Sequence, residues 1–124
     1  MKYDTQIINE KKIVFCRLEG DPNIDEAVSL AISLREKAAQ LGFNVFYDAR
    51  KMCVPESVMP AHDFSTKLSS LLGTSILRAI KVAFLYEPSR FNSHWKFWED
   101  VSMNRGLQFM GFTDEEEAME WLSS

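Results

Sequence analysis

Charged side chains follow two apolar segments of this chain, and they form its best candidate for a binding site. Asp48, Arg50 and Lys51 come at the end of one segment, and Arg90 comes shortly after another. Paired guanidinium groups bind carboxylates and phosphates through parallel hydrogen bonds. The pattern predicts a crevice for a small anionic or apolar ligand, with Arg50 and Arg90 as donors. The alternative is a set of solvated loop charges, because surface ion pairs are common and rarely functional.

Nucleophilic chemistry would depend on Cys53, which lies in an irregular stretch, and on one of two histidines, His62 and His94. A cysteine and a histidine can act as a nucleophile and its base. No motif places these residues beside one another, and their spacing is not that of metal ligands. We therefore expect no catalytic residue, no metal site and no cofactor, and we keep a thiol-dependent enzyme that uses Cys53 as an alternative.

Aromatic and basic residues alternate between Arg90 and Trp98. Such a composition can stack on nucleic-acid bases, yet Phe91, Trp95 and Trp98 fall on one stripe of a helix. The first interpretation is therefore core packing. The second is that the edge of this stripe forms an exposed patch for a partner or an apolar ligand, made of Phe91, Trp95 and Met103.

Composition limits the class of protein. The chain has 124 residues, of which 46% are hydrophobic and 26% charged, which suits one domain spanning residues 1–124. Its net charge of −4 argues against nucleic-acid binding. No apolar run is long enough for integral membrane association, and the first residues do not form a signal peptide. With two cysteines and no disulfide framework, we expect a cytoplasmic protein.

The elements that must position these residues follow from hydrophobic periodicity. Strands are expected where apolar residues run together, and helices where they recur every three or four positions. Residues 80–87 are apolar on both faces, as in an inner strand of a parallel sheet. A capping box at Thr113 and Glu116 begins the last helix. The expected strands are 5–9, 13–18, 43–48, 80–87 and 107–112, and the expected helices are 24–41, 60–72, 94–104 and the C-terminal segment.

This order predicts a single α/β domain. An N-terminal β-hairpin is followed by β-α repeats, which gives a mixed, mostly parallel sheet of about five strands. The four helices are expected mainly on one side of the sheet. If part of a sheet face remains open, self-association would cover it.

The element order resembles the STAS or SpoIIAA-like fold of bacterial anti-sigma-factor antagonists, and it is similar to a divergent branch of small stand-alone bacterial proteins. The resemblance rests on a strand ending in Asp-Ala-Arg, the strand Lys-Val-Ala-Phe-Leu, and the ending Gly-Phe-Thr-Asp-Glu-Glu-Glu-Ala-Met-Glu-Trp-Leu. It implies a non-enzymatic regulatory or protein-interaction module. A protein partner or self-association is expected, and the main alternative is a binder of a lipid or another amphiphile.

Regulatory members of that family carry Asp-Ser-x-Gly before the second helix, and a partner kinase phosphorylates the serine. Residues 53–60 of this chain read Cys-Val-Pro-Glu-Ser-Val-Met-Pro, so no Asp precedes Ser57 and no Gly follows it. Ser57 is the remaining candidate for phosphorylation. Its alternative role is a hydrogen bond to nearby backbone. We therefore expect a module without the serine switch.

Overall fold

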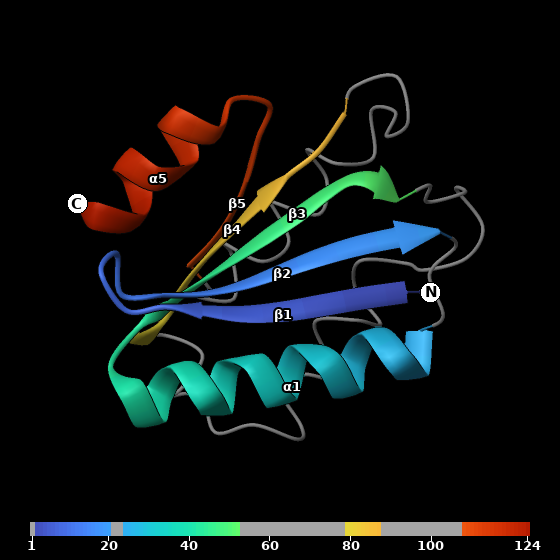
Figure 1. Ribbon diagram of the computed structural model, residues 1–124, viewed down its shortest axis with the longest axis horizontal. Helices are drawn as coiled ribbons and strands as arrows, with labels where there is room; N and C mark the ends of the chain where they lie inside the picture. The colour runs from blue at the N-terminus through green and yellow to red at the C-terminus, as the bar shows by residue number, and fades with distance from the viewer. Residues whose placement is uncertain (1, 21–23, 53–78, 88–107) are drawn as a thin grey trace.

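The computed structural model describes residues 2–20, 24–52, 79–87 and 108–124. They form one five-stranded sheet in the order β1-β2-β3-β4-β5, flanked by helices α1 and α5 (Figure 1). Strand β1 is antiparallel to β2, and the other neighbours are parallel. The elements are β1 (Lys2–Ile8), β2 (Ile13–Gly20), α1 (Ile24–Leu41), β3 (Asn44–Met52), β4 (Lys81–Leu85), β5 (Gln108–Phe112) and α5 (Glu115–Ser123).

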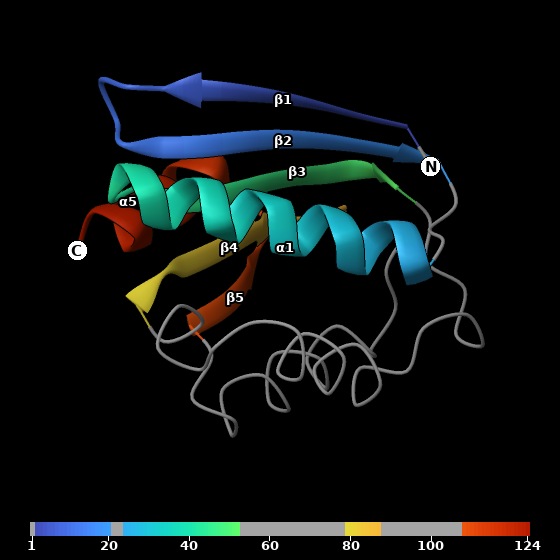
Figure 2. The ribbon, with the colours of Figure 1, turned by 90° about the horizontal axis from the view of Figure 1, so that it is seen from below.

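The two described helices cover opposite faces of the sheet. Helix α1 packs on β2 and β3, and α5 packs on the other face against β4 and β5 (Figures 1 and 2). The expectation that helices lie mainly on one side is therefore wrong for the described elements. Two helices are described where four were predicted, because the predicted helices at 60–72 and 94–104 lie outside the described residues. The mixed five-stranded sheet is confirmed, and the assignment of all 124 residues to one domain stays a prediction.

Alternating side chains of the strands build two hydrophobic cores. On the α1 face, Val14, Val45 and Val82 pack with Leu30 and Leu34 of the helix. On the α5 face, the buried cluster is Ile13, Phe46, Ala83, Leu85, Ala118 and Leu122. Because successive strand residues point to opposite faces, an inner strand needs apolar residues at nearly every position. This explains why the sequence pattern at 80–87 correctly predicts an inner strand, although β3 and not β4 is the central one.

Several element boundaries differ from the sequence-based ones. Strand β1 begins at Lys2, and β4 is limited to Lys81–Leu85. Strand β3 continues to Met52, so Arg50 and Lys51 are strand residues and do not belong to a loop. The extension arises because β3 keeps pairing with β2 after a register shift between Arg17 and Glu19.

The ends of α5 are held by side chains. Asp114, not Thr113, caps its start, since an Asp114 carboxylate oxygen accepts a hydrogen bond of 2.9 Å from the Glu116 amide. At the other end, the Asn44 side-chain amide donates to the Leu122 carbonyl at 3.0 Å, and the Lys81 ammonium donates to the Trp121 carbonyl at 3.3 Å. These bonds satisfy carbonyls that have no partner within the helix and fix α5 to β3 and β4.

Candidate functional site

Asp48 is the centre of a charged cluster on the α5 face of the sheet. Asp48 is 7% exposed, and both of its carboxylate oxygens accept hydrogen bonds. Arg50 Nε donates to Asp48 Oδ1 at 3.0 Å, and an Arg50 terminal nitrogen donates to Oδ2 at 2.8 Å. The Arg50 amide also donates to Oδ1 at 3.3 Å. Arg17, on the neighbouring β2, lies 4.0 Å from Oδ2.

These contacts control the ionisation of Asp48. Burial alone would raise the pKa of this carboxyl group, but hydrogen bonds from Arg50 and the charges of Arg50 and Arg17 outweigh it and hold the pKa below its ordinary value. The hydrogen bond to Asp48 in turn raises the pKa of the Arg50 guanidinium, and Glu115 and Glu87 add to this effect. Asp48 is therefore a carboxylate at neutral pH, held by two cations.

The cluster is arranged as a structural ion-pair network. Two nitrogens of the Arg50 guanidinium already donate to Asp48, so this pair of donors is not available to an anionic ligand. Lys51 is exposed and lies 3.9 Å from Glu19, on the same pair of strands. The proposed partner donor, Arg90, lies outside the described residues. The predicted crevice between the Arg50 and Arg90 segments therefore stays a prediction.

A second buried charge, Arg35 of α1, lies on the opposite face of the sheet. Arg35 is 4% exposed, and one terminal nitrogen donates to the Ala31 carbonyl at 3.1 Å and approaches the Tyr47 hydroxyl at 3.5 Å. Among the described residues, no carboxylate lies within ion-pair distance of Arg35. Burial raises the pKa of Tyr47, although the nearby Arg35 charge opposes that shift. Sequence analysis missed Arg35 because it flanks the apolar stripe of its helix.

The buried thiol of Cys16 is next to Tyr47 in the sheet register. Burial raises the pKa of Cys16 to about 12, despite a backbone hydrogen bond from Asp4 that lowers it. A thiol with that pKa is almost fully protonated at neutral pH and is a poor nucleophile. Cys16 therefore acts as a core residue.

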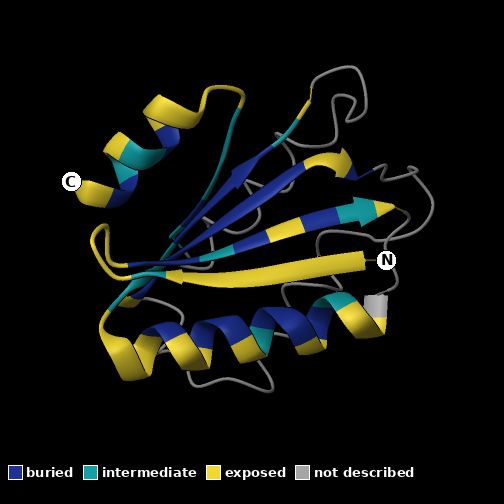
Figure 3. Ribbon diagram, viewed as in Figure 1, coloured by how far each residue is buried: buried dark blue, intermediate teal, exposed yellow. Residues whose placement is uncertain are grey.

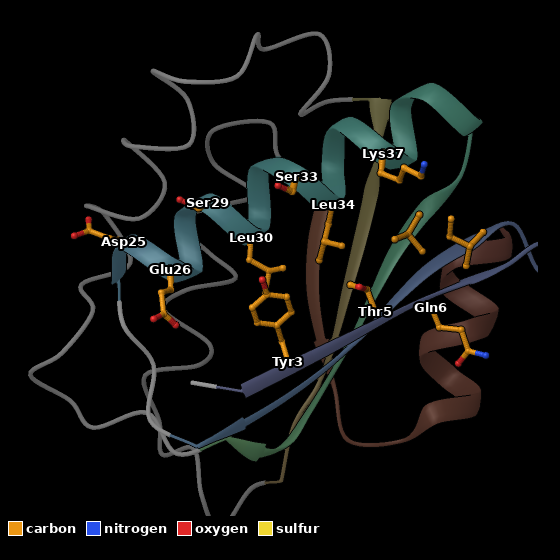
Figure 4. Close-up of a pocket in the computed structure, with 12 residues that line it drawn as sticks. Tyr3, Thr5, Gln6, Asp25, Glu26, Ser29, Leu30, Ser33, Leu34 and Lys37 are labelled. Atoms are coloured by element: carbon orange, nitrogen blue, oxygen red, sulfur yellow. The ribbon is translucent and has the colours of Figure 1, made fainter.

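A groove of about 1050 Å³ runs between the edge strand β1 and helix α1 (Figure 4). It exists because, among the described elements, α1 packs over β2 and β3 and leaves the α1 face of β1 uncovered. Tyr3 and Ile7 of β1, Val14 of β2, and Leu30 and Leu34 of α1 supply its apolar surface. Figure 4 shows the Tyr3 ring pointing from β1 toward Leu30.

The two ends of this groove differ in charge. Asp25 and Glu26, in the first turn of α1, lie at the end near Tyr3, and Lys37 lies at the opposite end (Figure 4). Ser29 and Ser33 line the helix side between them. Helix α1 returns antiparallel to β2 and hence runs in the same direction as β1. The acidic first turn of α1 therefore lies beside the start of β1, and Lys37 lies beside its end.

Sequence analysis missed this groove. The signal was present in the alternation of Tyr3, Thr5 and Ile7, but the expected strand began at residue 5 and so omitted Tyr3. No local pattern shows that α1 leaves β1 uncovered. The other sequence-based candidates lie outside the described residues, and they are Cys53, Ser57, His62, Phe91, His94, Trp95 and Met103.

A cluster of metal-ligating side chains and a membrane-spanning helix are both absent from the described residues. Within 2–20, 24–52, 79–87 and 108–124, no three His, Cys, Asp or Glu side chains are close enough together to bind a metal ion. Neither described helix has the length and apolar character needed to cross a bilayer.

Comparison with known proteins identifies the fold. A crystal structure of an uncharacterized DUF3478-family protein from Shewanella loihica PV-4, described as having a SpoIIAA-like fold, superposes with a TM-score of 0.57. The match covers 98% of this chain and 92% of the other, at 15% sequence identity. The predicted SpoIIAA-like fold is thus confirmed. No protein-family model matches the chain, and no curated protein matches it.

Proposed function

We propose that this protein is a non-enzymatic recognition module that binds an extended polypeptide along β1 and the adjoining groove. One observation carries the proposal: β1 is an edge strand whose outer backbone groups have no partner strand among the described residues, and it borders an apolar groove. An added strand would gain backbone hydrogen bonds from such an edge, and its alternate side chains would enter the groove.

The chemistry of the described residues supports binding over catalysis. The carboxylate of Asp48 is held by Arg50 and Arg17, and Cys16 is buried and protonated. Neither has the exposure and reactivity that a nucleophile or general base requires. The SpoIIAA-like fold is consistent with a regulatory interaction module in the cytoplasm, and the absence of the Ser57 switch remains part of the proposal.

A peptide-display experiment tests this function. The protein is immobilised sparsely, so that β1 stays accessible, and is challenged with a library of random peptides. We expect enrichment of extended sequences with alternating apolar residues. A Tyr3→Ser/Ile7→Ser double variant should lose their binding, whereas Glu120→Ser, on the exposed side of α5, should retain it. Equal peptide binding by the double variant, or no enrichment at all, would contradict the proposal.

Binding of an amphiphile is the second candidate function. It is favoured by the volume of the groove and by Lys37, whose ammonium group lies at one end of the apolar lining and suits an anionic headgroup. Native mass spectrometry of protein purified from cells should then reveal a bound small molecule that Lys37→Glu loses. Protein that carries no such molecule would leave this function without support.

A thiol-dependent enzyme that uses Cys53 is the remaining alternative. It requires the Cys53 thiol to react faster than an unperturbed cysteine. A thiol probe that labels Cys53 at the rate of the same cysteine in a short free peptide would remove this alternative.

A further inference from the structure

We infer that the polypeptide bound along β1 is a second copy of this chain, which pairs antiparallel to β1 across a two-fold axis. This inference rests on the proposed function and names the partner for it. The described strands of the two copies would then form one continuous sheet of ten strands, with β1 of each copy at its centre.

The shape of β1 makes it suitable for this pairing. Its seven residues pair with β2 without a register shift, and they contain no proline, glycine or bulge. Prolines, bulges and charged side chains normally protect an edge strand from pairing with another chain. Of these features β1 has only two charged side chains, Lys2 and Asp4. The large apolar side chains that are most exposed in the described part of the chain include two from β1, Tyr3 at 55% and Ile7 at 41%.

Symmetry fixes the register. Residues opposite one another in antiparallel strands point to the same face, so the axis must pass beside one residue of each copy. Only an axis at Thr5 pairs all seven residues of β1, with Lys2 opposite Ile8 of the second copy. Tyr3 then lies opposite Ile7 of the second copy, and Ile7 lies opposite its Tyr3. Aromatic residues opposite β-branched ones form favourable cross-strand pairs.

Charge complementarity argues for a second copy over an unrelated peptide. The two-fold axis places both α1 helices on one face of the joined sheet, running antiparallel. The acidic groove end of one copy, with Asp25 and Glu26, then faces the Lys37 end of the other, and the same contact repeats on the other side of the axis. A parallel two-fold pairing of β1 would instead place the two helices on opposite faces of the joined sheet, where these charges could not meet.

Disulfide trapping tests the register. Cys16 lies opposite Thr5 on β2, so both native cysteines are first replaced, and in this Cys16→Ala/Cys53→Ser background Thr5→Cys supplies the one thiol per chain. The two Thr5 positions lie at the axis with Cβ atoms about 5 Å apart, so mild oxidation should produce a covalent dimer. Lys2→Cys is the matched control, because its counterpart is six residues away along the strand, at about 20 Å. Cross-linking of Lys2→Cys in preference to Thr5→Cys would overturn the inference.

Mass measurement with a charge swap tests the interface. By sedimentation equilibrium at micromolar concentration, we expect the wild type to have the mass of two chains and Tyr3→Ser/Ile7→Ser the mass of one. Glu26→Lys and Lys37→Glu should each weaken the dimer by about tenfold, and the double variant should recover affinity because the charges again oppose each other. Far-ultraviolet circular dichroism of every variant identifies any that fails to fold.

The outcomes separate this inference from the proposed function. A wild type that is monomeric at hundreds of micromolar but still binds displayed peptides overturns the second copy and leaves polypeptide recognition in place. If Tyr3→Ser/Ile7→Ser and both single charge variants still have the mass of two chains, the dimer forms through another face, which also overturns the inference. A monomer that binds no peptide refutes both.

Discussion

Strands β1 and β2 belong to one hairpin and pair residue by residue, yet they differ strongly in burial. Cys16 of β2 is 0% exposed, whereas β1 is exposed from Lys2 to Ile7 (Figure 3). Strand β2 lies under α1 and contributes Ile13 to the cluster beneath α5, while β1 extends beyond the cover of α1. The difference teaches that burial in this sheet depends on which helix covers a strand. It also explains why β1 is the most exposed strand of the described sheet.

Thiol reactivity should show the largest difference between these strands. In Cys53→Ser, Cys16 is the only cysteine, and its pKa of about 12 gives a thiolate fraction on the order of a thousandfold below that of a free cysteine. We expect no rapid reaction with a disulfide reagent at neutral pH until the protein unfolds. Adding Gln6→Cys, on exposed β1, should give one rapidly reacting thiol. Rapid labelling of Cys16 in the native protein would show that β2 is not covered as described.

Truncation of two paired residues should show the next largest difference. Leu18 is buried on β2 and pairs with Tyr3 on β1. Leu18→Ala should lower the free energy of unfolding by about 2–5 kcal/mol, because it removes core contacts and leaves a cavity. Tyr3→Ala should change it by about 0.5 kcal/mol or less when measured by urea unfolding at concentrations where the chain is monomeric. Equal losses would contradict the difference in burial.

Two ion pairs on β2 and β3 should also differ in their contribution to the free energy of unfolding, because one is mostly buried and the other is exposed. Asp48→Asn removes a mostly buried carboxylate from Arg50 and Arg17, so we expect a loss of about 1–3 kcal/mol in urea unfolding. Glu19→Gln breaks only the exposed pair with Lys51, and its cost should be about 0–1 kcal/mol. A Glu19→Gln loss as large as that of Asp48→Asn would indicate that exposure does not set the strength of these pairs.

The lowered pKa of Asp48 predicts a pH dependence of stability. Since the folded protein holds this carboxyl below its ordinary pKa of about 3.9, it stabilises the fold at neutral pH. That contribution should disappear as the pH falls from the ordinary pKa through the lowered one. Unfolding midpoints between pH 7 and pH 2 should therefore fall less steeply for Asp48→Asn than for the wild type. Parallel curves would show that another carboxyl group controls acid stability.

Some features of this protein could be predicted from the sequence because they depend on neighbouring residues. The apolar stripe of 24–41 predicts α1 with the observed bounds, and Gly42, with a φ of 72°, ends it in the left-handed region that favours glycine. The almost unbroken apolar run at residues 80–87 predicts an inner strand. The element order was also sufficient to predict the SpoIIAA-like fold.

Other features were decided only by tertiary structure, because they depend on residues far apart in the chain. The extension of β3 to Met52 follows from its pairing with β2, and that extension carries Arg50 back to Asp48 instead of into a loop. The position of α1 over β2 and β3 buries Arg35 and leaves Tyr3 exposed. Local periodicity specifies which face of an element is apolar, whereas packing of distant elements determines which apolar face remains open for binding.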